Sequence, residues 1–208
     1  MRWPHGAWLL FAILATGCGS SERPAARVER KPVKPVSFQT TPEPSSTRGS
    51  RPGFYVAIDP EGERLLRERF DAPARALGVG EAPELTRIAV EDTARAEARG
   101  LELLDGLKHV ELAEGERAEL PFELVQGSCA TVIAHGGLGL REVDAFLIDE
   151  GPTLEVRAAD GRKGPASVVG GQRGCFVWTE REPKRLRAVV QARRGSGTLV
   201  FAVYIAKW

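Results

Sequence analysis

KRLRAVVQARRGSGTLVFAVYIA, residues 184–206, carries the clearest structural pattern in the chain. Every second residue in each half of this stretch is apolar: Leu186, Ala188, Val190 and Ala192, then Leu199, Phe201, Val203 and Ile205. An alternation with a period of two is typical of a β-strand that buries one face. The turn sequence Arg194-Gly195-Ser196-Gly197 separates the halves, so the stretch predicts two strands joined by a hairpin turn.

The rest of the C-terminal half repeats this pattern. Apolar residues again alternate at Ala118, Leu120, Phe122 and Leu124, and short apolar runs occupy residues 129–134, 143–148, 154–158 and 175–179. Glycine-rich turns lie between some of these runs, at residues 135–139 and 160–164. Roughly seven or eight short strands at such spacing predict a mainly β domain over residues 105–208, an antiparallel β-sandwich or jelly roll.

Residues 53–104 carry mostly helical signals after a short predicted strand, Phe54–Ile58. Asp59 followed by Pro60 combines a capping side chain with a first-turn proline, which predicts a helix that runs to Phe70. We also expect a helical turn at residues 73–77 and a helix at residues 83–99 with an apolar stripe of Leu85, Ile88 and Ala89. These stripes are too thin for a separate core, so the helical segment is expected to pack on the β-domain.

The N-terminus has the features of an export signal. Arg2 precedes an unbroken apolar run, Ala7–Ala15, which as a helix would span about 14 Å, less than half of a bilayer core. Such a short run is typical of a signal peptide rather than a membrane span. The residues that complete it, Leu14-Ala15-Thr16-Gly17-Cys18, resemble the lipobox of bacterial lipoproteins.

The lipobox resemblance implies that residues 1–17 are removed and that the thiol of Cys18 carries a diacylglycerol group. Two or three acyl chains hold a protein on a membrane far more firmly than one. Ala15 stands where the family most often has leucine, and an ordinary secretory signal with a chance cysteine is the alternative. Gly19 stands where an inner-membrane retention signal would be Asp, which favours the outer membrane, facing the periplasm or the cell surface.

Residues 18–52 differ in composition from the rest of the chain. They are rich in Pro, Ser, Thr and Arg and offer almost no apolar side chain to bury, so we expect a disordered, extended tether. The tether holds seven basic and three acidic residues, whereas the chain from Gly53 onward holds 21 basic and 25 acidic residues. A mildly acidic folded part argues against nucleic acid as a partner.

The cysteines agree with export. The chain has three, and a lipid on Cys18 leaves Cys129 and Cys175 as an even pair. In an oxidising compartment this pair predicts a disulfide between two of the expected strands, with two buried free thiols as the alternative. His109 and His135 stand alone, without CxxC or HExxH spacing, so these residue types predict no metal site.

The β-region resembles a known family on a series of short features. They are Gly127-Ser128-Cys129, a glycine-rich turn, the run VDAFLID at residues 143–149, Ala159-Asp160, Cys175 and Gly195-Ser196-Gly197. Their order and spacing are similar to those of the bacterial pre-peptidase C-terminal domain, over roughly Glu114–Tyr204. The resemblance implies a non-catalytic β-sandwich accessory module, which in some members binds calcium or a polymer. Ser128-Cys129-Ala130 departs from the family, which often has an aromatic residue just after the glycine of the first strand.

Two groups of side chains are candidates for ligand binding. Oxygen ligands for Ca²⁺ would come from acidic residues near the turns: Asp144, Asp149, Glu150 and Asp160. An aromatic platform for a sugar would come from Trp178, Tyr204 and Trp208. The alternatives are that the carboxylates are merely solvated and that the aromatic residues fill the core.

No reaction is predicted. Ser196 lies in a turn and lacks the strand, G-x-S-x-G and helix of a nucleophile elbow. The glycines at positions 136, 137 and 139 lack the following helix of a phosphate-binding loop. We therefore expect no catalytic residue and no cofactor. The expected function is that of a lipid-anchored, non-enzymatic binding or scaffolding module with an unknown protein or polysaccharide partner, the alternative being a carbohydrate- or calcium-binding accessory module of the cell envelope.

Overall fold

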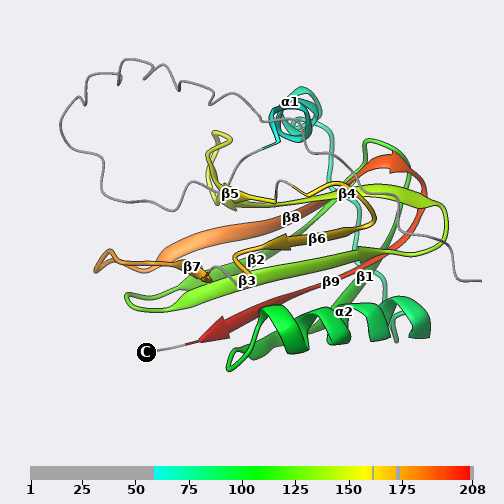
Figure 1. Cartoon of the computed structure of the whole chain (residues 1–208). Helices are drawn as coiled ribbons and strands as arrows, with labels where there is room; N and C mark the ends of the chain where they lie inside the picture. The colour runs from blue at the N-terminus through cyan, green and yellow to red at the C-terminus, as the bar shows by residue number, and fades with distance from the viewer. Residues whose placement is uncertain (1–58, 161, 172–173, 207–208) are drawn as a thin grey trace, which may run out of the picture. The chain divides into compact units, whose positions relative to one another are not determined.

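The computed structural model describes residues 59–160, 162–171 and 174–206 (Figure 1). In these residues the chain forms two helices and nine strands. Their bounds are α1 (Pro60–Glu68), α2 (Glu84–Glu97), β1 (Glu102–Leu112), β2 (Arg117–Leu124), β3 (Cys129–Gly136), β4 (Leu140–Asp149), β5 (Val156–Ala159), β6 (Ala166–Val169), β7 (Phe176–Val177), β8 (Lys184–Gly195) and β9 (Gly197–Ala206). The signal, Cys18, the tether, the expected strand Phe54–Ile58 and Trp208 lie outside the described residues.

The strands form two sheets in which all neighbours are antiparallel. One sheet has five strands in the order β1-β9-β3-β6, with β7 also paired to β3, and the other has four in the order β2-β8-β4-β5. The apolar residues predicted on β2 and β8 are buried between the sheets, as are Leu199, Phe201 and Val203 of β9. The prediction of a mainly β, antiparallel sandwich is therefore confirmed.

The chain crosses between the two sheets at Ser196, which corrects the predicted hairpin. β8 pairs with β2 and β4 in the four-stranded sheet, whereas β9 pairs with β1 and β3 in the five-stranded sheet. The crossing is tight: Gly195 has φ +85°, and a Cβ there would meet the carbonyl of Gly139. Only glycine adopts this conformation without strain at such a close approach.

The two helices cover the outer faces of the two sheets, and Figure 1 shows them on opposite sides of the sandwich. Leu66 of α1 packs with Phe146, Ile148 and Val189 on the four-stranded sheet. A separate apolar cluster contains Val90 of α2 and the outer face of the five-stranded sheet, including Ile133, Val168, Val200, Ala202 and Tyr204. The expectation that the helical segment packs on the β-domain is confirmed.

Helix α1 begins as predicted. The carboxylate of Asp59 accepts a hydrogen bond from the backbone N–H of Glu61 at 3.1 Å, and Pro60 is the first helical residue. The helix ends at Glu68, two residues before the predicted end. Arg117 of β2 stabilises this end, since its guanidinium donates to the carbonyls of Arg69 and Phe70, each at 2.8 Å.

Residues 73–77 do not form the predicted helical turn. Their backbone instead lies along the edges of β1 and β2: Arg75 N–H donates to the carbonyl of Arg117 at 2.8 Å, and Gly78 N–H donates to the carbonyl of His109 at 2.7 Å. Leu77 packs against the core between the sheets. The unpaired backbone groups of two edge strands thus outweigh local helix propensity, and we call residues 71–83 the edge strap.

The apolar stripe predicted for α2 is wrong. Leu85 is 81% exposed and Ile88 is 39% exposed, whereas Thr86 and Val90 form the buried face. The buried face is made of smaller side chains, which face the outer side of the five-stranded sheet. The larger aliphatic residues of α2 point to solvent.

A disulfide joins Cys129 at the start of β3 to Cys175, the residue before β7. It fixes the short β7 strand beside β3, where Phe176 pairs with Ala130 and Val177 with Cys129. The predicted pairing is confirmed. Neither helix among the described residues is both long and apolar enough to cross a bilayer.

Candidate functional site

The carboxylates proposed as calcium ligands do not converge. Asp149 accepts from Arg157 and forms an ion pair with Lys184, in each case at 2.7 Å. The nearest cation to Glu150 is Arg185, at 3.9 Å. Across residues 59–160, 162–171 and 174–206, no group of three or more His, Cys, Asp or Glu side chains could hold a metal ion.

Asp160 and Asp144 are buried in two further, separate environments. The carboxylate of Asp160 accepts hydrogen bonds from the backbone N–H of Val168 at 2.9 Å and of Arg162 at 3.2 Å, so it orders the turn between β5 and β6. Asp144 accepts from the side chain of Gln191 at 2.9 Å on the outer face of the four-stranded sheet. Each carboxylate is thus used for structure.

The aromatic residues do not form a platform. Trp178 is buried in the core between the sheets and donates through its indole N–H to the carbonyl of Glu182 at 2.7 Å. Tyr204 is buried in the other apolar cluster, under α2. Because a sugar needs the exposed faces of neighbouring rings, the described pair cannot supply the expected site.

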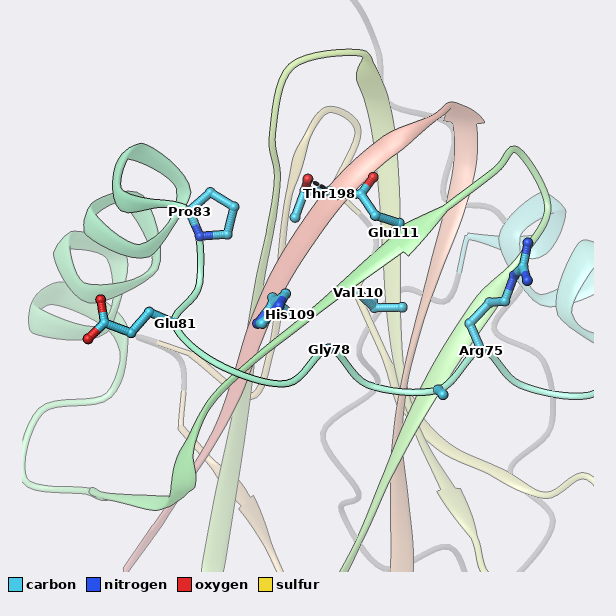
Figure 2. Close-up of a pocket in the computed structure, with 9 residues that line it drawn as sticks. Arg75, Gly78, Glu81, Pro83, His109, Val110, Glu111 and Thr198 are labelled. Atoms are coloured by element: carbon cyan, nitrogen blue, oxygen red, sulfur yellow. Dashed lines mark hydrogen bonds between the residues drawn. The ribbon is translucent and has the colours of Figure 1, made fainter.

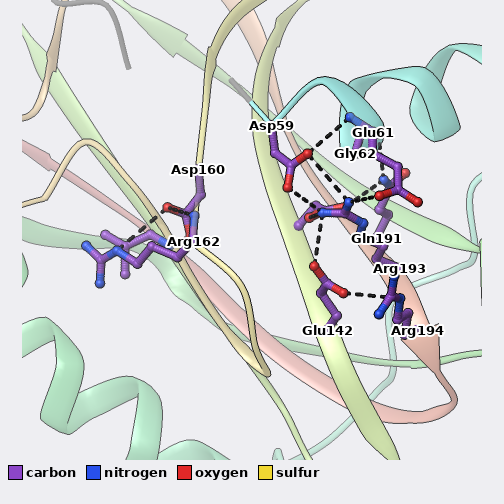
Figure 3. A network of polar contacts seen from close by, with 11 residues as sticks. Asp59, Glu61, Gly62, Glu142, Asp160, Arg162, Gln191, Arg193 and Arg194 are labelled. Atoms are coloured by element: carbon purple, nitrogen blue, oxygen red, sulfur yellow. Dashed lines mark hydrogen bonds and ion pairs between the residues drawn. The ribbon is translucent and has the colours of Figure 1, made fainter. Parts of the chain in front are cut away.

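The largest group of interacting charges surrounds Arg193 of β8 (Figure 3). Its guanidinium lies 2.7 Å from Asp59, 2.7 Å from Glu61 and 3.0 Å from Glu142, and 3.6 Å from Asp144. Arg193 and the last two carboxylates are buried. We call these five residues the Arg193 cluster, and it joins the start of α1 to β4 and β8.

The close packing of α1 on this cluster requires a glycine. The side-chain amide of Gln191 donates to the carbonyl of Gly62 at 3.0 Å and also to Asp144. A Cβ at Gly62 would lie 2.8 Å from a carboxylate oxygen of Asp144. The helix backbone therefore rests directly on the buried carboxylate.

Burial and charge shift the pKa values in the Arg193 cluster in opposite directions. Hydrogen bonds from Arg193 hold the pKa of Asp59 below its ordinary value. Loss of solvent raises the pKa of Asp144, although Gln191 and Arg193 oppose that shift. Burial disfavours the charge on Arg193, but its hydrogen bonds to Asp59 and Glu61 outweigh burial and raise its pKa. Arg193 is the cation shared by four carboxylates, and Arg194 adds a contact to Glu142 at 3.4 Å, so the cluster joins α1 to β4 and β8 and keeps an excess of negative charge.

A different feature has the form of a binding site. A pocket of about 570 Å³ opens on the outer face of the five-stranded sheet, between the edge strap and the start of α2 (Figure 2). His109 and Glu111 of β1 and Thr198 of β9 line it, since Thr198 pairs directly with Glu111 in the sheet. Arg75, Ala76 and Gly78 border it on one side and Glu81 and Pro83 on another. We call it the edge pocket.

The edge pocket exists because the strap stands across the sheet edge. A Cβ at Gly78 would collide with the imidazole of His109, so glycine lets the strap approach β1 closely enough for its backbone hydrogen bond. The hydroxyl of Thr198 donates to the carboxylate of Glu111. A volume of several hundred Å³ lies in the range of ligand pockets, although five of the nine lining residues are polar or charged and ligand pockets are mainly apolar.

The sequence did not reveal the edge pocket. Its lining comes from β1, which no alternation marks, and from the strap, of which residues 73–77 were expected to form a helical turn. His109 on β1 and His135 on β3 both pair with Val200 of β9, so they lie on the same face of the five-stranded sheet with β9 between them. The Nε2 of His135 lies 2.7 Å from the hydroxyl of Thr93 on α2, and burial lowers the pKa of His135.

Ser196 is exposed at the crossing between sheets, and no hydrogen bond joins it to a histidine or carboxylate of the described residues. The Arg193 cluster holds α1 on the sheet, and its Glu142 Oε1 and Arg193 Nε atoms are buried without a hydrogen-bond partner. No protein-family model matches the chain, and no curated protein matches its sequence.

Proposed function

We propose that the protein is an exported bacterial lipoprotein, anchored through lipid on Cys18, whose β-sandwich is a non-enzymatic binding or scaffolding module. The disulfide between Cys129 and Cys175 is the observation that carries export, because such bonds form and persist in oxidising compartments. The apolar run Ala7–Ala15 and the lipobox-like residues that end at Cys18 support the anchor.

A binding role is supported by the contrast between the two polar regions of the domain. The Arg193 cluster lies under the start of α1 and holds that helix on the sheet, whereas the edge pocket presents side chains around open space. The partner is a protein or polysaccharide of the envelope, and the acidic excess from Gly53 onward argues against nucleic acid. The domain is also similar in order and spacing to pre-peptidase C-terminal modules, which are accessory and not catalytic.

The paired carboxylates and the buried Trp178 and Tyr204 lend no support to the calcium- or carbohydrate-binding alternative. Gly19 follows Cys18 where an inner-membrane retention signal would have Asp, which favours the outer membrane, with the domain facing the periplasm or the cell surface.

Membrane fractionation tests the anchor. In a bacterium with lipoprotein export, we expect wild type in the membrane pellet, resistant to high salt and released by detergent, because acyl chains insert in the bilayer. Cys18→Ala is expected in the soluble periplasmic fraction, while the neighbouring Ser20→Ala remains in the pellet. Retention of Cys18→Ala in the detergent-sensitive membrane fraction after residues 1–17 have been removed would contradict the proposal.

Separation of inner- and outer-membrane vesicles on a density gradient tests which membrane carries the protein. Wild type is expected with outer-membrane vesicles, and Gly19→Asp is expected to move to inner-membrane vesicles. Wild type that sediments with the inner membrane would refute the proposed location without affecting the anchor.

A further inference from the structure

Another hollow borders the edge strap and is lined by arginines. Its volume is about 470 Å³, and residues 72–76 of the strap line it together with the turn between β1 and β2. Its charged lining residues are Arg69, Arg75, Glu116 and Arg117. It shares Arg75 and Ala76 with the edge pocket, but Figure 2 shows the side chain of Arg75 pointing away from His109. We call this hollow the arginine pocket.

The guanidinium groups of Arg69 and Arg75 converge on one carboxylate, that of Glu116. Arg75 Nη2 lies 2.8 Å from Glu116 Oε1. Arg69 packs over the turn just before Glu116, since a Cβ at Gly115 would collide with its guanidinium. The pKa of Glu116 lies below its ordinary value, because Arg75 and then the backbone N–H of Ala113 donate hydrogen bonds to it and because both arginines place positive charge nearby. The pocket is thus already electropositive enough to hold one carboxylate.

The contacts of the pocket leave guanidinium donors unused. The side chain of Arg69 is exposed and makes no hydrogen bond or ion pair with another described residue. Among the described residues, Arg75 is engaged through Nη2 with Glu116 and through no other side-chain atom. A guanidinium carries five N–H donors in a flat fork that matches the paired oxygens of a carboxylate or a phosphate. Both arginines can therefore donate to a further anion.

The side chains around the lining do not cancel this positive charge. Glu119 lies 2.8 Å from the buried Arg117 and also 2.8 Å from Arg187. Glu114, beside the turn, instead accepts a hydrogen bond at 2.8 Å from the last backbone N–H of β8. Asp71 of the strap is exposed and lies outside the lining. Four arginines at and beside the pocket thus share two carboxylates.

From the convergence of guanidinium groups with unused donors, we infer that the arginine pocket binds an oxyanion, the carboxylate or phosphate group of a ligand. The oxygens of this group accept from Arg69 and from the remaining N–H groups of Arg75, while repulsion from Glu116 keeps the affinity low. This site goes beyond the proposed function, because it depends neither on the lipid nor on the edge pocket. Membrane fractionation of Cys18→Ala does not test it, so the two ideas fail separately.

An anion titration followed by NMR tests the inference. Inorganic phosphate and, separately, acetate are added at millimolar concentration to the ¹⁵N-labelled protein carrying Cys18→Ala. Sodium chloride holds the ionic strength constant, because salt screens weak charge interactions. We expect saturable shifts at the amides of Ala72, Ala76 and Gly115 with at least one of the two anions. The anion that binds more tightly shows whether the site prefers phosphate or carboxylate groups.

Two substitutions in the pocket are expected to change the affinity in opposite directions. Arg69→Gln removes the unpaired guanidinium and is expected to weaken binding about fivefold, as for one partly exposed ion pair. Glu116→Gln removes the competing carboxylate and frees Arg75, so it is expected to strengthen binding by about the same factor. The backbone carbonyl of Arg69, to which Arg117 donates, is kept in both variants, and their spectra report whether each is folded.

Arg99→Gln is the matched control. Arg99 is also exposed and has no described carboxylate within ion-pair distance, but it lies two residues after the end of α2. The control loses the same charge as Arg69→Gln and is expected to bind the anion as wild type does. The absence of saturable shifts at the pocket amides with both anions would overturn the inference. Equal weakening by Arg69→Gln and Arg99→Gln would also overturn it, because the shifts would then follow net charge.

Discussion

Arg193 is the residue on which the attachment of α1 depends most. It is buried, and without it Asp144 would be left as a buried carboxylate with no cation in contact, while Glu142 would keep only Arg194, at 3.4 Å. Removing one partner of a buried ion pair typically costs about 3 to 5 kcal/mol. We expect Arg193→Met to lower the free energy of unfolding in urea by this amount.

Arg185 on the same strand serves as the control, because its side chain is 75% exposed and its nearest carboxylate oxygens lie at 3.8 Å and 3.9 Å. Arg185→Met is expected to change the free energy of unfolding by no more than about 0.5 kcal/mol. Equal effects of the two substitutions would show that the Arg193 cluster does not stabilise the fold.

Two aspartates of the Arg193 cluster are expected to affect stability with opposite dependence on pH. The pKa of Asp144 is raised by burial, so its contribution to stability is full below the ordinary value of 3.8 and falls as pH rises. The pKa of Asp59 is lowered by Arg193, so its contribution is full above 3.8 and is lost as pH falls.

Urea unfolding of Asp144→Asn and Asp59→Asn from acid to neutral pH measures this difference. Relative to wild type, Asp144→Asn should become more stable as pH rises, and Asp59→Asn should become less stable. Parallel profiles for the two variants would be incompatible with the opposite electrostatic environments of the two carboxylates.

The orientation of α2 makes a testable distinction between its two faces. Val90 is completely buried under the helix, and its truncation to alanine should lower the free energy of unfolding by about 2 kcal/mol. Leu85 is the larger side chain but is 81% exposed, so Leu85→Ala should change stability by less than about 0.5 kcal/mol. Stability is measured by thermal or urea unfolding. A larger effect at Leu85 than at Val90 would indicate that Leu85 faces the sheet, as expected from the sequence.

The link between β3 and β7 should stabilise the sandwich as a whole. The disulfide closes a sequence separation of 46 residues. The loss of chain entropy in the unfolded state then corresponds to about 4 kcal/mol of stability. Cys129→Ala with Cys175→Ala is expected to lower the unfolding midpoint in urea accordingly, and wild type under reducing conditions should match it. An unchanged midpoint in both cases would show that the disulfide does not stabilise the folded domain.

Alternation predicted β2, β8 and β9, and short apolar runs predicted strands at the positions of β3, β4, β5 and β7. On β2 and β8 the alternating apolar residues face the core, because one face of each strand meets the opposite sheet, whereas Val189 of β8 lies on the outer face under α1. β1 lacks this signal: most of its side chains are only partly buried, and Asp105 and Gly106, with φ of +58° and +74°, interrupt its register. Its pairing depends on β9, nearly a hundred residues away in sequence, which local patterns do not encode.

The polar sites were less predictable than the strands. The disulfide could be predicted, because a lipid on Cys18 leaves one pair of cysteines. The Arg193 cluster could not, since Arg193 and Asp59 are 134 residues apart and each looks like an ordinary surface charge. Burial turns such charges into partners, and burial is a property of the folded arrangement.

In the molecule as a whole, two sheets form the core and a helix covers each outer face (Figure 1). Arg193 and Arg117 hold the two ends of α1, the first helix of the folded domain, by separate polar contacts. The chain that leads to the proposed anchor thus enters the domain at a helix that polar contacts hold at both ends. The edge pocket lies on the other sheet, so the pocket and the attachment of α1 use different faces.

Intact-mass spectrometry of protein purified from membranes, with and without reduction, addresses anchor and disulfide together. We predict a chain that begins at Cys18, carries the mass of two or three acyl chains on that residue, and gains two hydrogens on reduction. An unlipidated chain, or a mass unchanged by reduction, would contradict the account of a lipid-anchored, disulfide-linked envelope protein.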